Sequence, residues 1–214
     1  MKAIVIGATG LTGNKLATKL LSQKEVTTIT CLVRNVPVNT NKKVKYKLID
    51  FNSMQNIKIT ADVAFSCLGT TIKNAGSKEN FYMVDYHYNL MFAKACKKQG
   101  IKNFVLMSAI GADSKSSIFY NRIKGQLEDA IIKLKFKSLT IVRPSVIEGP
   151  RIERRIGELV LRKIMLGINP LLQGRFRKYR SVNVDKIVSA MINGAILNKP
   201  GITIIENQEI LSYN

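Results

Sequence analysis

The 214-residue sequence predicts an α/β fold, a doubly wound parallel sheet in a single domain. Short β-branched runs alternate with segments of helical periodicity, and a glycine-rich turn joins the first strand to the first helix. The length suits one well-formed core, while a second full domain would be cramped. Because the only Asn-Gly pair, Asn193-Gly194, lies inside a helical pattern, we expect right-handed crossovers rather than hairpins.

The first strand, Ala3–Ile6, leads directly into Gly7, Gly10 and Gly13. Gly7 allows a tight turn, Gly10 lets a pyrophosphate approach the main chain, and Gly13 lets the helix pack on the strand. The free amides at the start of the helix favour phosphate. This order predicts a dinucleotide site, and the alternative is a glycine-rich turn that binds nothing.

The next two elements are a helix over residues 12–23 and a strand, Thr27–Val33, that ends at Arg34. In a dinucleotide fold this strand end faces the adenosine ribose, where an acid suits the 2′-hydroxyl and an arginine suits a 2′-phosphate. Arg34 therefore favours NADP(H), with NAD(H) still possible. The alternative is an ordinary solvated arginine.

A third strand, Val44–Ile49, is followed by Asp50, which either touches the adenine ring or caps a turn. A fourth strand, Asp62–Cys67, ends in a loop that passes close to the cofactor. That loop contains Leu68, Gly69 and Thr70.

A long helix is predicted over residues 78–99, with Gly100 just beyond its end. The fifth strand, Asn103–Met107, then ends at Ser108. The carboxyl ends of parallel strands share one edge of the sheet, and ligands bind there. Five residues fall at predicted strand ends on that edge: Gly7, Arg34, Asp50, Gly69 and Ser108.

Tyr120 and Lys124 lie four residues apart on a predicted helix, so they share one face. A cation beside a phenol favours its ionised form, which suits tyrosine for acid–base chemistry. Ser108 would hold the substrate oxygen beside Tyr120 during hydride transfer. The alternative is a tyrosine that only packs while the lysine reaches solvent.

The chain resembles the extended or atypical branch of the short-chain dehydrogenase/reductase superfamily. The resemblance rests on GATGLTG at residues 7–13, Ser108, the Tyr120–Lys124 pair and RPSVIEGP from Arg143. More narrowly, SCLGTT at residues 66–71 and the segment of residues 108–128 resemble the Tat-interactive-protein-like oxidoreductases, which have a single Rossmann domain.

This resemblance implies roles for several residues. Lys124 would also hold the nicotinamide ribose, and Arg34 the 2′-phosphate. A sixth strand is expected over residues 138–142, and the loop that follows it would line the nicotinamide pocket with Pro144 and Val146. The pyrophosphate would be cradled by Gly7, Thr9, Gly10, Leu11, Thr12 and Gly13.

Two features depart from the family pattern. Asp85 stands where extended members often carry asparagine. The expected substrate side, residues 145–214, is also short compared with that of sugar-nucleotide epimerases. The second departure argues against a bulky nucleotide-sugar substrate.

The formal charge of +20 predicts attraction to polyanions. Basic residues crowd between Arg151 and Arg180, partly on a helix expected over residues 153–166. A solvated face explains them most simply, and the alternatives are an anionic substrate, a subunit contact, nucleic acid or a membrane surface. Because no nucleic-acid module accompanies them, we expect no nucleic-acid partner, and a subunit contact would make a homodimer. A helix over residues 183–197 and a strand, Ile202–Glu206, end the chain.

Neither a membrane span nor a secretory signal is expected, so the sequence predicts a cytoplasmic protein. The three cysteines lack metal-type spacing, and we expect reduced thiols and no metal site. The predicted function is an NADP(H)-dependent oxidoreductase of a small carbonyl or alcohol, with Ser108, Tyr120 and Lys124 as catalytic residues. The alternative is a sensor or assembly protein that binds the cofactor without turnover.

Overall fold

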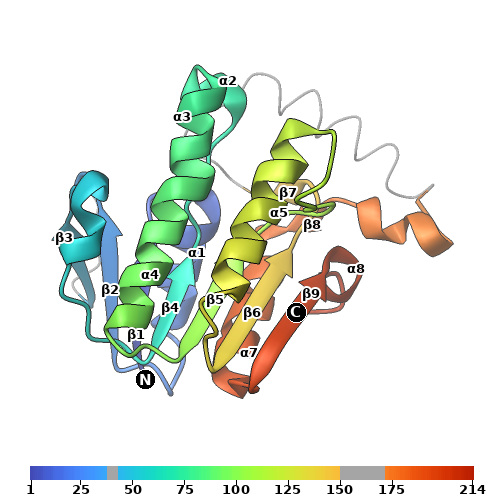
Figure 1. Ribbon diagram of the computed structural model, residues 1–214. Helices are drawn as coiled ribbons and strands as arrows, with labels where there is room; N and C mark the ends of the chain where they lie inside the picture. The colour runs from blue at the N-terminus through green and yellow to red at the C-terminus, as the bar shows by residue number, and fades with distance from the viewer. Residues whose placement is uncertain (38–42, 150–171) are drawn as a thin grey trace.

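The computed structural model describes residues 1–37, 43–149 and 172–214 (Figure 1). The basic helix expected over residues 153–166 lies outside these residues. So do Arg151, Arg154, Arg155, Arg162 and Lys163.

A seven-stranded parallel sheet forms the centre of the molecule, in the order β3-β2-β1-β4-β5-β6-β9. This is the predicted doubly wound sheet, and the strand order reverses at β1. Its strands are β1 (Lys2–Ile6), β2 (Thr28–Val33), β3 (Val44–Leu48), β4 (Val63–Ser66), β5 (Asn103–Met107), β6 (Ser138–Arg143) and β9 (Gly201–Glu206). Two short strands, β7 (Ile147–Glu148) and β8 (Val182–Asn183), pair separately; the sequence analysis missed both.

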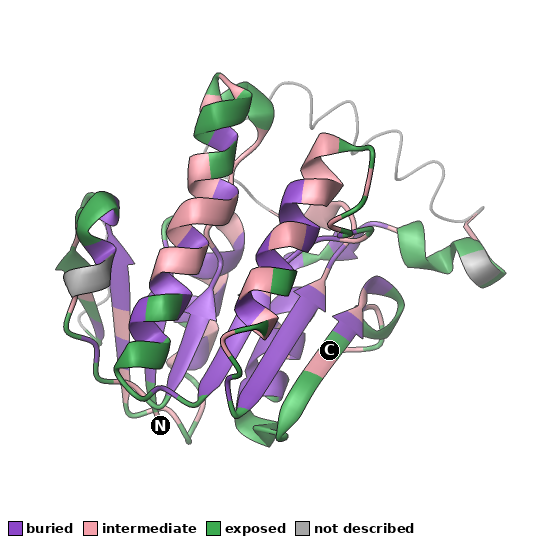
Figure 2. Ribbon diagram, viewed as in Figure 1, coloured by how far each residue is buried: buried purple, intermediate pink, exposed green. Residues whose placement is uncertain are grey.

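Helices cover both faces of the sheet (Figure 1). On one face lie α3 (Lys78–Tyr82), α4 (Asn89–Lys98) and α5 (Phe119–Ile132), and on the other α1 (Leu11–Leu20) and α7 (Val184–Leu197). The structure also has short helices, α2 (Ile72–Ala75) and α8 (Asn207–Ile210), and 3₁₀ turns at Phe51–Asn56 and Gly174–Tyr179. Buried apolar side chains on the central strands form one core against each helical layer (Figure 2).

The long helix predicted over residues 78–99 is not uniform. A π-helical turn, Met83–Tyr88, separates α3 from α4. The Asn89 side-chain amide donates to the Val84 carbonyl at 2.9 Å and to the Leu68 carbonyl at 3.2 Å. Because π turns widen a helix locally, this turn changes the direction of the side chains before Asn89. The buried Asp85 is one of them.

Cys31, Cys67 and Cys96 are free and buried. Burial raises the pKa of Cys31 to about 12 and raises the pKa of Cys67 and Cys96 as well. The thiols are therefore protonated at neutral pH, as expected of packed cysteines.

Candidate active site

The glycine turn brings three segments of backbone together. Gly7 has a φ of +74°, and a Cβ there would lie 2.5 Å from the Cys67 carbonyl. A Cβ on Gly13 would overlap the Gly7 carbonyl oxygen, which also accepts a 3.0 Å hydrogen bond from the Gly10 amide. Glycine at positions 7 and 13 therefore sets how closely α1 approaches β1 and the end of β4.

The start of α1 has the features of an anion site. Gly10 occupies the N-cap position and offers no side-chain cap, and the first turn carries no acid. The Asn14 amide bonds the Gly10 carbonyl at 2.9 Å, so the preceding first-turn amides lack intrahelical acceptors. These are the amides of Leu11, Thr12 and Gly13. A diphosphate fits this position because amides and the helix dipole both favour negative charge.

Arg34 and Asp50 both follow strands at the same edge of the sheet. Arg34 is exposed directly after β2. The Asp50 carboxylate accepts a 3.0 Å hydrogen bond from the Asn52 amide and caps the 3₁₀ turn that follows. The capping alternative for Asp50 is thus confirmed, while a contact with adenine stays a prediction.

Lys124 and Asp85 form a buried ion pair. Their Nζ and Oδ1 atoms are 2.7 Å apart, with side chains 4% and 1% exposed. The other carboxylate oxygen of Asp85 accepts a 2.7 Å hydrogen bond from the Thr70 amide. A Cβ on Gly69 would lie 3.2 Å from the Asp85 carboxylate, so glycine lets the loop after β4 lie against the pair. The loop predicted from Leu68 to Thr70 and the α5 lysine therefore meet through Asp85.

Burial by itself lowers the pKa of Lys124, but the carboxylate of Asp85, together with Tyr120 and Glu128, raises this pKa above its ordinary value. The ammonium is therefore charged at neutral pH despite its burial.

Tyr120 lies on the same face of α5 as Lys124, as the spacing predicted. The Lys124 Nζ is 5.9 Å from the centre of the Tyr120 ring. The ring also packs against Phe81 of α3, with centroids 5.7 Å apart. Tyr120 is only partly buried.

Ser108 lies in a different environment from the one predicted. It is 4% exposed, and its hydroxyl donates to a carboxylate oxygen of Glu128. Within the described chain, no hydrogen bond links Ser108 to Tyr120 or Lys124. Its role in holding substrate stays a prediction.

Glu128 belongs to a network that the sequence analysis did not find. Arg143, at the end of β6, binds Glu128 at 2.5 Å and Glu206 of β9 at 2.9 Å. Hydrogen bonds to Glu128 and Glu206 raise the pKa of Arg143, although partial burial opposes this. The signal in the sequence was the four-residue spacing of Tyr120, Lys124 and Glu128, which places them on successive turns along one face of the helix.

The segment after β6 is held to neighbouring loops. The Pro144 carbonyl accepts a 2.9 Å hydrogen bond from the Ile110 amide, and the Val146 carbonyl accepts one from the Val182 amide at the same distance. Pro144 and Val146 thus lie beyond the same edge of the sheet as the glycine turn and Ser108.

The family model described as NAD(P)H-binding matches residues 7–156. The chain belongs to this NAD(P)H-binding family. Rat Protein HTATIP2 is 33% identical over 97% of this chain and 86% of its own length. Protein FMP52, mitochondrial, from Candida albicans is 38% identical over 72% of this chain and 70% of its own.

Solved structures of similar fold include MoeE5 in complex with UDP-glucose and NAD. It has a TM-score of 0.73 and 15% identity, covering 99% of this chain and 80% of that one. This NAD(P)H-binding protein is thus an atypical short-chain dehydrogenase/reductase with a Rossmann fold.

The predicted cytoplasmic location of this family member is wrong. The Candida albicans relative and other fungal relatives are named as mitochondrial proteins. The prediction relied on the lack of a membrane span and a secretory signal, and neither feature distinguishes the cytoplasm from mitochondria. Among the described residues no helix is long and apolar enough to cross a membrane. The same residues contain no group of three metal-ligating side chains.

Proposed function

We propose that the protein is an NADP(H)-dependent oxidoreductase that acts on a small carbonyl or alcohol. The observation that carries this proposal is the buried Lys124 ammonium, held by Asp85 and placed one helical turn from a partly accessible Tyr120. A buried charge is costly to maintain, and its place beside a phenol at the ligand edge of the sheet favours a chemical role.

The glycine turn and the start of α1 would hold the pyrophosphate, and Arg34 would bind the 2′-phosphate. Lys124 would contact the nicotinamide ribose, with Pro144 and Val146 near the nicotinamide. When bound, the cofactor supplies or accepts the hydride. NADP(H) is preferred because an exposed arginine follows β2, where an acid would suit the free 2′-hydroxyl of NAD(H).

Tyr120 is the acid–base residue in this proposal. In the direction of reduction its phenol donates a proton to the substrate oxygen, and the Lys124 ammonium stabilises the phenolate that remains. Asp85 keeps Lys124 protonated and in position. Ser108 positions Glu128, or is released from it to hold the substrate oxygen.

Residues 145–214 would form the substrate side, with the β7–β8 pair at its base. This region is short, which favours a small substrate over a nucleotide sugar. We also place the protein in mitochondria, because fungal relatives carry that location in their names.

The test combines binding with turnover. NADPH and NADH are titrated by fluorescence, and carbonyl reduction is then screened with wild-type protein, Tyr120→Phe and the control Tyr213→Phe. Tyr120→Phe should bind NADPH normally and lose 10²–10⁴-fold in turnover, about the contribution of one acid–base group. Unchanged turnover in Tyr120→Phe would exclude this mechanism.

A second candidate, a cofactor-binding sensor, is favoured by one observation. The Ser108 hydroxyl is engaged by Glu128, so one of the three expected catalytic groups has another partner. A sensor should bind NADPH tightly, change its protease sensitivity on binding, and transfer no hydride to any carbonyl in single-turnover experiments.

A further inference from the structure

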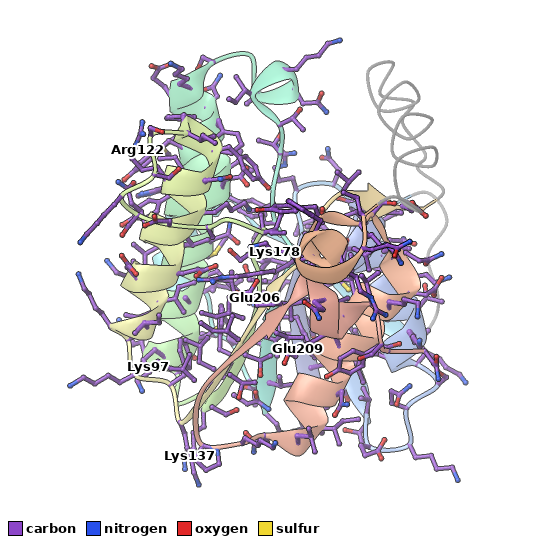
Figure 3. The ribbon with its side chains drawn as sticks, turned by 90° about the vertical axis from the view of Figure 1, so that its right-hand side faces the viewer. Lys97, Arg122, Lys137, Lys178, Glu206 and Glu209 are labelled. Carbon is purple, nitrogen blue, oxygen red and sulfur yellow. The ribbon has the colours of Figure 1, made fainter. Side chains whose placement is uncertain are left out.

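The carboxylate of Glu128 is fixed by a guanidinium that is itself held on two sides. Arg143 donates from Nε to one oxygen of Glu128 at 3.0 Å and from Nη2 to the other at 2.5 Å. Its Nη1 donates at 2.9 Å to Glu206, which lies at the carboxyl end of β9 (Figure 3). Arginine stays charged and has no acceptor, so this two-point contact favours an ionised Glu128 with a set orientation.

The hydroxyl of Ser108 has a defined hydrogen-bond direction as a result. Ser108 and Glu128 are hydrogen-bonded, and both residues are buried, at 4% and 2% exposed. A hydroxyl carries one proton and two lone pairs, whereas an ionised carboxylate can only accept. The proton in this bond therefore belongs to Ser108, and the serine oxygen is left with lone pairs and nothing further to donate.

A substrate carbonyl competes poorly with Glu128 for this proton. Hydrogen bonds to an ionised acceptor are roughly twice as strong as those between neutral groups. If Ser108 turned to a neutral carbonyl, it would exchange the stronger bond for the weaker one and leave a buried carboxylate with one partner fewer. We therefore expect Ser108 to keep its bond to Glu128 when a ligand is bound.

The Glu128 turn is also separate from the turn that carries the acid–base residue. Tyr120 and Glu128 lie on α5 with Lys124 between them, about 12 Å apart along the helix axis at the usual rise per residue. Because Ser108 is held to the Glu128 turn, it faces a different part of a ligand from the part that Tyr120 protonates.

We propose that Glu128 is a positioning residue that makes Ser108 a hydrogen-bond acceptor, so that the preferred substrate is a hydroxyketone whose hydroxyl donates to Ser108. This inference rests on the proposed function, in which a hydride from NADPH and a proton from Tyr120 reduce the carbonyl. The hydroxyl read by Ser108 is unchanged in that reaction. Since Ser108 is buried, a ligand without the donor leaves the serine oxygen unpaired, and this loss gives the selectivity.

The first test compares ketones that differ in this donor. Hydroxyketones with the hydroxyl one, two or three carbons from the carbonyl are each paired with the alkyl ketone in which a methyl group replaces the hydroxyl. We expect kcat/KM of the wild type to favour at least one hydroxyketone by about tenfold or more. Ser108→Ala should abolish this preference without changing a buried charge.

Two outcomes separate this inference from the proposed function. Equal use of every pair, or reduction only of carbonyls that lack a hydroxyl, would overturn the inference and leave the proposed function standing. Reduction of none of these ketones, and of no carbonyl in the wider screen, would overturn both.

The second test asks whether Glu128 acts through Ser108. In Glu128→Gln the amide oxygen should face Arg143, which has only donors, and the amide nitrogen should then donate to Ser108 and free the serine proton. A methoxyketone can accept that proton but cannot donate. Its kcat/KM relative to the matching hydroxyketone should therefore rise about tenfold in Glu128→Gln.

The control for this variant is Glu206→Gln, which alters the other carboxylate on Arg143 and should keep the wild-type ratio. In a Ser108→Ala background, Glu128→Gln should not change the ratio further. Each ratio is measured on one preparation, so a loss of folded protein cancels, and circular dichroism checks the fold. An unchanged ratio in Glu128→Gln, or an equal change in Glu206→Gln, would overturn the positioning role.

Discussion

The two halves of the site are built differently. The glycine turn at the start of α1 presents backbone amides and depends on the absence of side chains at Gly7 and Gly13. The α5 face presents side chains, and its geometry depends on buried charges that compensate one another, such as Lys124 and Asp85. The first half tolerates no added atom at Gly7 or Gly13, while the second tolerates no uncompensated charge.

The largest effect on cofactor binding is expected at Gly13. A Cβ there would overlap the Gly7 carbonyl oxygen, so Gly13→Ala must displace α1 from β1. We expect a loss of about 3 kcal/mol in the free energy of unfolding, as for overpacking in a core, and no measurable NADPH binding. The matched variant is Gly10→Ala, whose Cβ would lie 3.4 Å from the same oxygen, an ordinary contact. Equal destabilisation of the two variants in urea denaturation would show that packing in the turn is looser than described.

The next effect concerns the buried ion pair. Lys124→Met or Asp85→Asn alone leaves one buried charge without its partner, and each should cost about 3–5 kcal/mol. The double variant should cost clearly less than the sum of the two, because neither charge remains. A double-mutant cycle from denaturant unfolding measures the coupling, and strict additivity would contradict a direct interaction.

The pH dependence of the pair has a defined sign. The pKa of Lys124 is raised above 10.5 in the folded protein, so its contribution to stability is fully present below that pH. The contribution is lost as the pH rises through the folded-state pKa. In Lys124→Met, the alkaline part of the stability curve should therefore be flatter than in the wild type.

A smaller effect is expected at Arg34. Arg34→Ala should weaken NADPH binding about tenfold or more, as for loss of a charge-assisted hydrogen bond, and leave NADH binding unchanged. Parallel fluorescence titrations with both nucleotides measure the ratio. Equal weakening for both would assign Arg34 to a part of the site that does not read the 2′-phosphate.

The smallest effect is expected at Asp50. Asp50→Ala removes the cap on the 3₁₀ turn and should cost about 1 kcal/mol of stability. If Asp50 also touches adenine, affinity for both nucleotides falls together. Thermal unfolding with and without NADPH separates the two roles.

The sequence was sufficient to predict the strands of the main sheet and the glycine turn, the half of the site that is built from backbone. Each of the seven strands in the main sheet was predicted within two residues of its observed ends, because β-branched runs between turn residues are a local signal. The side-chain half was only partly predictable. Tyr120 and Lys124 follow from helical spacing, but the partner of Lys124 does not. Asp85 lies on a π turn, and directly after that turn the Asn89 amide donates to the carbonyl of Leu68 in the loop after β4. Neither the π turn nor this contact leaves a periodic pattern in the sequence.

For Ser108, the sequence predicted the position of the residue but not its hydrogen-bond partner. Its position at the end of β5 was predicted correctly, but its hydroxyl faces Glu128, twenty residues later. Position along a strand can be inferred from local sequence, whereas the choice between two nearby polar partners is made by packing. The two-residue strands β7 and β8 were missed for a similar reason, since their pairing joins segments more than thirty residues apart.

The three buried cysteines can serve as probes of local unfolding. Each thiol is enclosed and protonated in the folded chain, on β2, at the end of β4 and on α4. A thiol-labelling reagent can therefore modify them only in molecules that have opened at those elements. The order in which Cys31, Cys67 and Cys96 become labelled would show which element separates first, with no probe introduced.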